Sequence, residues 1–87
     1  MEFEWDEAKD AANRAKHGVG FDVARELRWE DALPEKDVRA EYGEDRFIIY
    51  AYRATRLYAC VFTLRQDRIR IISLRKANKR EERDCGR

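Results

Sequence analysis

The apolar residues in the first part of the chain recur at the spacing of an α-helix. The segment 6–18 opens with Asp6, which suits the N-cap, and Gly18 stands where a helix would just have ended. We therefore predict a helix here, after a short strand over residues 1–5. The apolar positions of this helix are all small, so we expect it to lie close against a neighbouring element. They are Ala8, Ala11, Ala12 and Ala15.

A second short helix is predicted over residues 19–29. Gly20 is its N-cap, and Pro34 prevents a simple continuation beyond the segment. The residues expected to face inward are Phe21, Ala24 and Leu27. We expect Trp5 and Trp29 to be core or interface anchors.

The period changes to that of β-strands after Pro34. Residues 37–42 alternate apolar and charged side chains, as a half-exposed strand does. The segments 46–54 and 56–65 are apolar on both faces and predict central strands, and 68–75 predicts the last strand. Turn-forming residues separate these segments, which indicates successive antiparallel hairpins.

A short tail helix completes the prediction. Asn78, with Glu81 three residues later, outlines an N-terminal capping box for residues 78–87. The element order is thus β-α-α-β-β-β-β-α. We predict one α+β domain over residues 1–87, with a small antiparallel sheet and helices gathered on one face.

Charge is distributed very unevenly along the chain. Charged residues make up 43% of it, yet the formal net charge is only +1. Residues 1–45 hold 7 Lys/Arg and 14 Asp/Glu, whereas residues 46–87 hold 12 and 4. Such asymmetry favours an anionic partner for the basic half. Alternatively, the two halves neutralise each other through surface ion pairs.

Several classes of protein are disfavoured by composition. Cys60 and Cys85 are far apart and only one histidine is present, so neither a disulfide framework nor a zinc site is expected. Cys60 should be a buried, inert strand thiol. No long apolar run occurs and the N-terminus is unlike a signal peptide, so we expect a cytoplasmic protein without a membrane anchor.

The two ends of the chain resemble the BrnT toxins of bacterial type II toxin–antitoxin systems. The resemblance rests on "FEWDEAKDAANRAKHGVGFDVA" and "DRIRIISLRKANKREER". It implies a RelE-like fold, a toxin that cleaves RNA and arrests translation, and a DNA-binding antitoxin, BrnA, as partner. The residues that differ from the family pattern, Gly20, Ala51 and Asn78, concern backbone geometry and capping.

The chemistry of such a cleavage needs few protein groups. The ribose 2′-hydroxyl attacks the adjacent phosphate, so the protein must hold that phosphate, stabilise added negative charge and move protons, without a cofactor or metal. Arginine suits the first two tasks, and 14 of the 19 cations are arginine. Strand alternation places Ile69, Ile71, Ser73 and Arg75 on one face of the last strand.

Arg75 is the preferred phosphate ligand, because further cations follow it. Arg65 ends the preceding strand in the same way, but antiparallel neighbours would place the two at opposite edges of the sheet. This hypothesis requires the Arg75 guanidinium to be open toward a phosphodiester. An internal ion pair without a basic hollow beside it would contradict it.

Two further residues are candidates for proton transfer. Imidazole titrates near neutral pH, so His17 is one, although cations such as Lys16 and His17 also suit a helix C-terminus. Glu81 is the other, although it equally fits the capping box. The expected RNA-binding cations are Lys9, Lys16, Lys76, Lys79 and Arg80.

Two other functions explain the charge distribution. A nucleic-acid-binding module could clamp phosphates without cleaving them. A protein-interaction domain could present the basic end to an acidic partner. The expected partners are RNA and a ribbon-helix-helix antitoxin like BrnA, in a dimeric or heterotetrameric complex. DNA would be contacted only through that antitoxin, because the N-terminal half is acidic.

Overall fold

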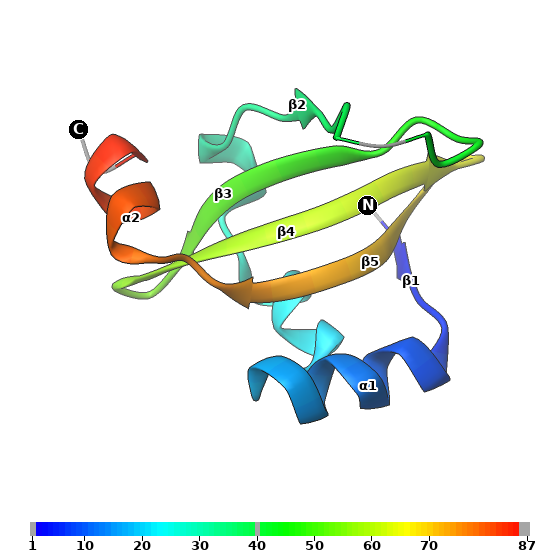
Figure 1. Cartoon of the computed structure of the whole chain (residues 1–87), viewed down its shortest axis with the longest axis horizontal. Coiled ribbons are helices and arrows are strands. Elements are labelled where there is room, and N and C mark those ends of the chain that lie inside the picture. The colour runs from blue at the N-terminus through cyan, green and yellow to red at the C-terminus, as the bar shows by residue number, and fades with distance from the viewer. Residues whose placement is uncertain (1, 40, 86–87) are drawn as a thin grey trace.

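The computed structural model describes residues 2–39 and 41–85. The parts of the predicted elements that fall on Met1, Ala40 and residues 86–87 lie outside the described residues. The elements are β1 (Glu2–Glu4), α1 (Glu7–His17), the 3-10 helices η1 (Phe21–Glu26) and η2 (Trp29–Asp31), β2 (Glu35–Lys36), β3 (Phe47–Arg53), β4 (Arg56–Arg65), β5 (Arg68–Lys76) and α2 (Lys79–Cys85) (Figure 1). The predicted α+β class and the overall order are confirmed.

The five strands form one sheet in the order β1-β5-β4-β3-β2. The three long strands are successive antiparallel hairpins, as predicted. The first strand, however, pairs in parallel with the last, so that Phe3 lies opposite Ile69. The sheet is therefore mixed and not wholly antiparallel, because helix α1 carries the chain across before it returns through the hairpins.

The predicted strand over residues 37–42 is wrong. The strand that pairs with β3 contains only Glu35 and Lys36. Beyond it, the buried carboxylate of Asp37 accepts hydrogen bonds from the Arg39 side chain and the Tyr42 hydroxyl. These local bonds fold the chain back on itself and end the ladder.

The core lies on one face of the sheet, which we call the inner face. Ile49, Cys60 and Leu74 are paired across β3, β4 and β5 on this face, and all three are fully buried. Phe21 and Ala24 of helix η1 and Leu27 directly after it pack into this core, as predicted. The opposite, outer face carries the neighbouring row of Tyr50, Ala59 and Arg75.

Both tryptophans pack against this core. Trp29 packs between Phe3, whose ring is tilted to it, and Phe62, which it meets edge-on; Trp5 meets Phe21 edge-on. Arg25 covers the Trp5 ring, 4.7 Å from its centroid. Their interpretation as anchors is confirmed.

A β-bulge corrects the predicted faces of β5. The register shifts between Val61 and Phe62, so that β5 has one extra residue there. Beyond the shift Leu74 joins Ile69 and Ile71 in the core, whereas Arg75 points to the outer face. The prediction that Arg75 shares a face with Ile69 and Ile71 is therefore wrong.

The buried face of α1 is polar, not the alanine stripe that was predicted. Ala8, Ala11, Ala12 and Ala15 are exposed, whereas Asp10 and Asn13 are buried. The Asp10 carboxylate accepts a hydrogen bond from the Phe21 amide at 2.8 Å, which fixes the start of η1. Helix α1 therefore buries the face whose side chains supply hydrogen-bond partners to backbone groups, and not an apolar face.

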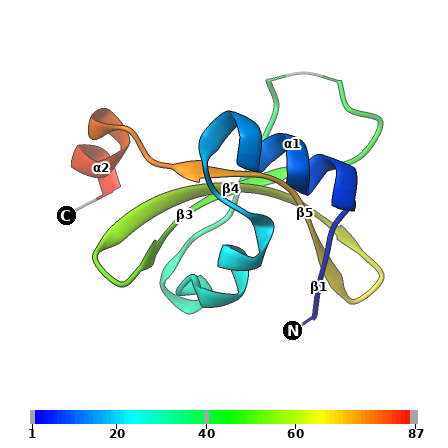
Figure 2. The ribbon, with the colours of Figure 1, turned by 90° about the horizontal axis from the view of Figure 1, so that it is seen from below.

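The helices are divided between the two sides of the sheet. The 3-10 helices lie on the inner face and α1 runs beside β5 (Figure 2). Helix α2 instead continues from the end of β5 and bonds through Glu81 to Tyr50 on the outer face. The prediction of helices on one face holds for the N-terminal ones only, because the capped turn at Asn78 directs α2 toward the outer face.

Candidate functional site

Arg75 forms a bidentate ion pair with Glu81. Its Nη1 and Nη2 lie 2.8 Å from the two carboxylate oxygens, and the Tyr50 hydroxyl donates to the same carboxylate at 3.3 Å. The Arg75 guanidinium was expected to be free of the chain's own carboxylates. That expectation is wrong, because the capping turn brings Glu81 back to the end of β5.

The pair does not use all the donors of Arg75. Nη1 also donates to the Lys76 carbonyl. The side edge of the guanidinium, formed by Nε–H and the second Nη2–H, makes no hydrogen bond to a described residue. The side chain is 31% exposed. Arginine can bind one carboxylate end-on and a phosphate side-on, so Arg75 is oriented by Glu81 and keeps a free bidentate edge.

Glu81 also closes the predicted capping box. Its carboxylate accepts from the Asn78 amide at 2.9 Å, and its own amide donates to Asn78 Oδ1 at 2.8 Å. The hydrogen bonds from Arg75 are the main reason that the pKa of Glu81 falls to about 2. A carboxylate of such low basicity is a poor general base, which favours the structural role for Glu81.

His17 lines a hollow beside the free edge of β5. The hollow has a volume of about 260 Å³ and lies between α1 and the bulged part of β5. It is lined by Lys9, Ala12, Asn13, Lys16, His17, Ile72 and Ser73. This hollow thus brings together three of the predicted residues, because side chains three or four positions apart share one face of α1. They are Lys9, Lys16 and His17.

The five predicted RNA-binding cations differ from most others in the chain. Eight arginine and lysine side chains form ion pairs with carboxylates. None of the five does so among residues 2–39 and 41–85. All five are exposed; they are Lys9, Lys16, Lys76, Lys79 and Arg80. We call this set the open cations.

Four of the open cations, Lys16, Lys76, Lys79 and Arg80, lie toward one end of the molecule, whereas Lys9 is in the first turn of α1. The C-terminal end of α1 lies next to the C-terminal end of β5, from which α2 begins; both views agree on this (Figures 1 and 2). Lys76 closes β5 and Lys79 opens α2. The last turn of α1, the end of β5 and the first turn of α2, which carry these cations, therefore lie toward the same end of the molecule as Arg75.

Arg65 lies elsewhere. It lies opposite Arg68 in the register of β4 and β5, next to the turn that joins them. Arg75 lies opposite Ala59, near the other end of the same ladder. Arg65 lines a separate hollow with Glu4 and Arg70, where Glu4 already binds Arg70. The structure does not bring Arg65 to the other predicted site residues.

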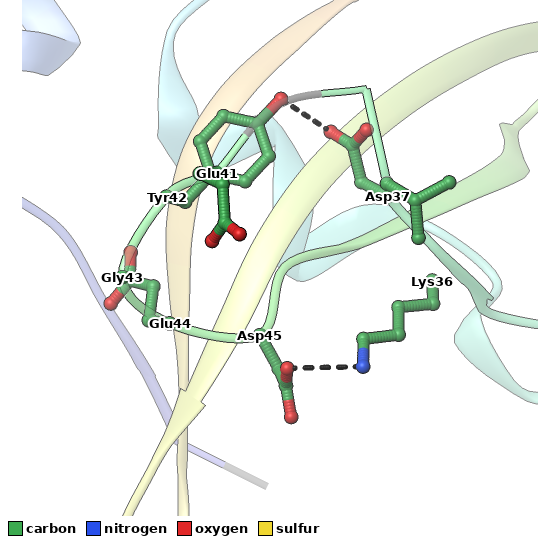
Figure 3. A pocket seen from close by; sticks show the side chains of 8 residues that line it. Lys36, Asp37, Glu41, Tyr42, Gly43, Glu44 and Asp45 are labelled. Carbon is green, nitrogen blue, oxygen red and sulfur yellow. Dashed lines mark hydrogen bonds and ion pairs between the residues drawn. The ribbon is translucent and has the colours of Figure 1, made fainter.

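A more voluminous hollow than the one beside His17 is acidic. It has a volume of about 650 Å³ and is formed by the loop between β2 and β3 (Figure 3). Its charged lining is Lys36, Asp37, Glu41, Glu44 and Asp45. Asp37, Glu44 and Asp45 are each already paired with a cation, so this hollow offers a phosphate no unpaired cation, and the basic surface at the end of β5 is the better candidate.

Sequence reasoning missed Arg39, which belongs to this same loop. It was assigned to the solvent side of a strand that does not form. Asp37 binds its guanidinium through two hydrogen bonds of 2.8 and 2.7 Å, while the Arg39 side chain stays 67% exposed. The local signal was the spacing of Asp37, Arg39 and Tyr42, which suits a side-chain-bonded loop as well as a strand.

None of the described helices is long and apolar enough to cross a membrane. Comparison with protein families shows a match over residues 5–81 to a family described as the ribonuclease toxin, BrnT, of type II toxin–antitoxin systems. A search of curated proteins found no match.

Proposed function

The chain belongs to the BrnT family of ribonuclease toxins from type II toxin–antitoxin systems, and we propose that it is a metal-independent endoribonuclease that cuts RNA at the basic end of its sheet. The family match covers most of the chain and supports a ribonuclease. The reaction type, the residues and the partner are proposed from the arrangement of side chains.

The observation that carries the proposal is the contrast between paired and open cations. Arg68 and Arg70 are bound by carboxylates of β1, and Arg53 by Glu26. The open cations have no such partners in the described chain. Unpaired cations gathered toward one end of the molecule suit a polyanion, which binds where positive charge is not already neutralised.

The substrate supplies the nucleophile in the proposed reaction. The 2′-hydroxyl attacks its own 3′-phosphate, and the bond to the 5′-oxygen of the next nucleotide breaks. The attacking hydroxyl loses a proton and the leaving oxygen gains one, so the products are a 2′,3′-cyclic phosphate and a 5′-hydroxyl. Arg75 binds the phosphate through its free side-on edge and stabilises the extra charge of the transition state.

His17 is the proposed proton-transfer residue. It is half-buried at the end of α1 in the hollow that Lys9 and Lys16 also line, where cations favour the approach of RNA. Glu81 acts by holding Arg75 in place. It stays ionised because its pKa lies at about 2, and it therefore fixes the guanidinium at neutral pH.

The biological part of the proposal concerns translation and the partner. Cleavage of cytoplasmic RNA would inhibit translation, and a BrnA-like ribbon-helix-helix antitoxin would neutralise the toxin by covering the open cations. A dimeric or heterotetrameric complex would contact DNA only through that antitoxin. Growth arrest on induction, relieved by co-expression of a BrnA-like antitoxin, tests this part.

The chemical part is tested by incubating the purified protein with a defined RNA in the presence of EDTA. We expect cleavage at substoichiometric protein, with 5′-hydroxyl ends that polynucleotide kinase can label directly. A catalytically inactive binding module would leave the RNA intact while still retarding it in a gel. Products with 5′-phosphate ends, or cleavage abolished by EDTA, would contradict the mechanism.

A further inference from the structure

The hollow beside His17 has two walls that a single side chain holds together. Helix α1 forms one wall and β5 the other, and the two lie side by side (Figure 2). The Asn13 Nδ2 donates to the carbonyls of Leu74 and Val19, and its Oδ1 accepts from the Leu74 amide. Both Nδ2 hydrogens are therefore used, so Asn13 fixes the walls and has no donor left for a ligand.

Part of the lining of this hollow is apolar. Ile72 is the extra residue of the β-bulge and has no partner in β4, and its side chain is only half-buried. On α1, Ala12 is exposed and too small to fill the hollow. An aliphatic side chain left partly in water is stabilised when a flat ring packs against it.

Two polar side chains of the hollow have no partner in the described chain. Neither the Ser73 hydroxyl nor the His17 imidazole forms a hydrogen bond within residues 2–39 and 41–85. A hydroxyl can donate to the edge of a nucleobase or accept from it. An apolar wall beside such a group is the combination by which proteins recognise unpaired bases of RNA.

Two of the open cations flank the hollow along α1. Lys9 is in the first turn of the helix and Lys16 in the last. Their Cα atoms are about 10 Å apart along the helix axis, at 1.5 Å per residue. Their ammonium groups can thus meet the backbone phosphates on either side of an inserted base. A phosphate alone would bind the cations and leave the apolar lining uncovered.

The volume of the hollow suits a single base. It is about 260 Å³. At roughly 30 Å³ for each water molecule, this is room for about nine waters, which one base with a similar number of heavy atoms can displace. A base pair is too large, so the hollow favours single-stranded RNA.

The hollow adjoins the proposed phosphate ligand along β5. Ser73 lies opposite Val61 and Arg75 lies opposite Ala59, so the two are on the same face of the strand. Two residues of a strand span about 7 Å. One nucleotide can bridge this distance, with its base in the hollow and its 3′-phosphate toward Arg75.

We propose that this hollow binds one unpaired nucleobase of the RNA, that of the nucleotide whose 2′-hydroxyl attacks. The base packs on Ile72 and its edge bonds to the Ser73 hydroxyl, so Ser73 determines which base precedes the cut. This inference rests on the proposed function and adds a specificity site to it. His17 keeps its proton-transfer role, because in the same hollow it lies beside the ribose of that nucleotide.

The test compares strands that carry bases with a strand that carries none. The probes are short 2′-O-methylated oligomers of adenylate, cytidylate and uridylate, and an abasic tetrahydrofuran oligomer of equal length and charge. None of them can be cleaved, so only binding is measured.

Three variants complete the test. Ala12→Leu fills the hollow and Ser73→Ala removes its hydroxyl. Ala11→Leu is the matched control, because Ala11 is equally exposed on α1 but does not line the hollow. Leucine is nearly as good a helix former as alanine, so α1 should fold in both leucine variants. Far-ultraviolet circular dichroism and thermal melts check this, and the probes compared on the unchanged protein need no variant.

We expect the unchanged protein to bind at least one base-bearing strand about 10-fold more tightly than the abasic strand, as contact with one base provides. Ala12→Leu should reduce this difference to less than about threefold and keep the affinity for the abasic strand. Ser73→Ala should reduce the differences among the three base-bearing strands. Ala11→Leu should bind all four probes as the unchanged protein does.

The outcomes separate this inference from the proposed function. If the protein cleaves RNA but binds the abasic strand as tightly as the others, or if Ala12→Leu matches Ala11→Leu, the base site is overturned and the ribonuclease proposal stands. An unaltered base preference in Ser73→Ala overturns the role of Ser73. If base-dependent binding is lost in Ala12→Leu but RNA is never cleaved, the base site stands and the catalytic proposal fails. If no probe binds, both are overturned.

Discussion

The side-chain amide of Asn13 bonds to the backbone of Leu74 as a neighbouring strand would. Its Nδ2 donates to the Leu74 carbonyl at 2.7 Å, and its Oδ1 accepts from the Leu74 amide at 3.2 Å. Nδ2 also donates to the Val19 carbonyl at 2.9 Å. Because β1 pairs only with Arg68–Arg70, Asn13 supplies the edge of β5 where no strand continues.

Replacing Asn13 by alanine should therefore destabilise the fold strongly. Three buried backbone groups would lose their partner, at about 1–3 kcal/mol for each that stays unsatisfied, and partial hydration should leave a net loss of about 2–4 kcal/mol. Urea unfolding monitored by tryptophan fluorescence measures it. Lys16→Ala, an exposed change on the same helix, should shift stability by less than about 0.5 kcal/mol. Equal stability of the two variants would show that water replaces the Asn13 bonds.

Acid should release α2 from the sheet. The pKa of Glu81 is lowered in the fold from 4.5 to about 2, chiefly by Arg75, so its stabilising effect is present above pH 4.5 and is lost as the pH falls toward 2. Glu81→Gln should lack this part of the acid dependence and should be less stable than the unchanged chain at pH 7.

The measurement is the free energy of unfolding in urea between pH 2 and pH 7. Hydrogen bonding from Arg39 lowers the pKa of Asp37 from 3.8 to about 2. Asp37 should therefore cause a similar loss of stability in acid, which the Glu81→Gln variant still shows. Glu82→Gln, one residue away, is the control and should follow the unchanged chain. Parallel curves for Glu81→Gln and Glu82→Gln would show that the Arg75 pair contributes nothing to stability.

His17→Ala should reduce RNA cleavage by about 10²–10⁴-fold, the usual contribution of a proton-transfer group, with little change in affinity for methylated RNA. His17 is only half-buried, so the melting temperature should change by a few degrees at most. Single-turnover cleavage from pH 5 to pH 9 provides the rate and its pH profile. An undiminished rate with an unaltered pH profile removes His17 from the mechanism.

Arg75→Ala and Arg65→Ala should behave differently. The first removes the guanidinium beside the open cations and should lower the cleavage rate by about 10²–10³-fold, as loss of a charge-stabilising donor does. Arg65 is at the other end of the β4–β5 ladder, so its replacement should lower the cleavage rate less than about threefold. Equal losses would mean that RNA binds along the whole sheet and not at one end.

The two cysteines should differ in reactivity. Cys60 is fully buried, and burial raises the pKa of its thiol to about 12, whereas Cys85 is exposed. At pH 8 we expect iodoacetamide to modify Cys85 alone, and both residues only in urea. Mass spectrometry of the unchanged chain and of Cys85→Ser measures this. Rapid labelling of folded Cys85→Ser would indicate that the core opens at β4.

The sequence by itself determined the features that depend on near neighbours. The segment 56–65, apolar on both faces, predicts β4 at its observed bounds, and Asp6 and Gly18 correctly enclose α1. The capping box of α2 follows from the three-residue spacing of Asn78 and Glu81. Each of these is fixed by side-chain period or by bonds within one turn, so a short window of residues suffices.

Only the tertiary structure decided which side chains meet. The bulge turned Arg75 to the outer face, the unpaired edge of β5 drew Asn13 into the interior, and Asp37 folded Arg39 out of the expected strand. Asn13 and Asp37 are polar groups buried by distant packing, and each had to find a partner. Such a partner is selected by three-dimensional proximity, which local periodicity does not encode.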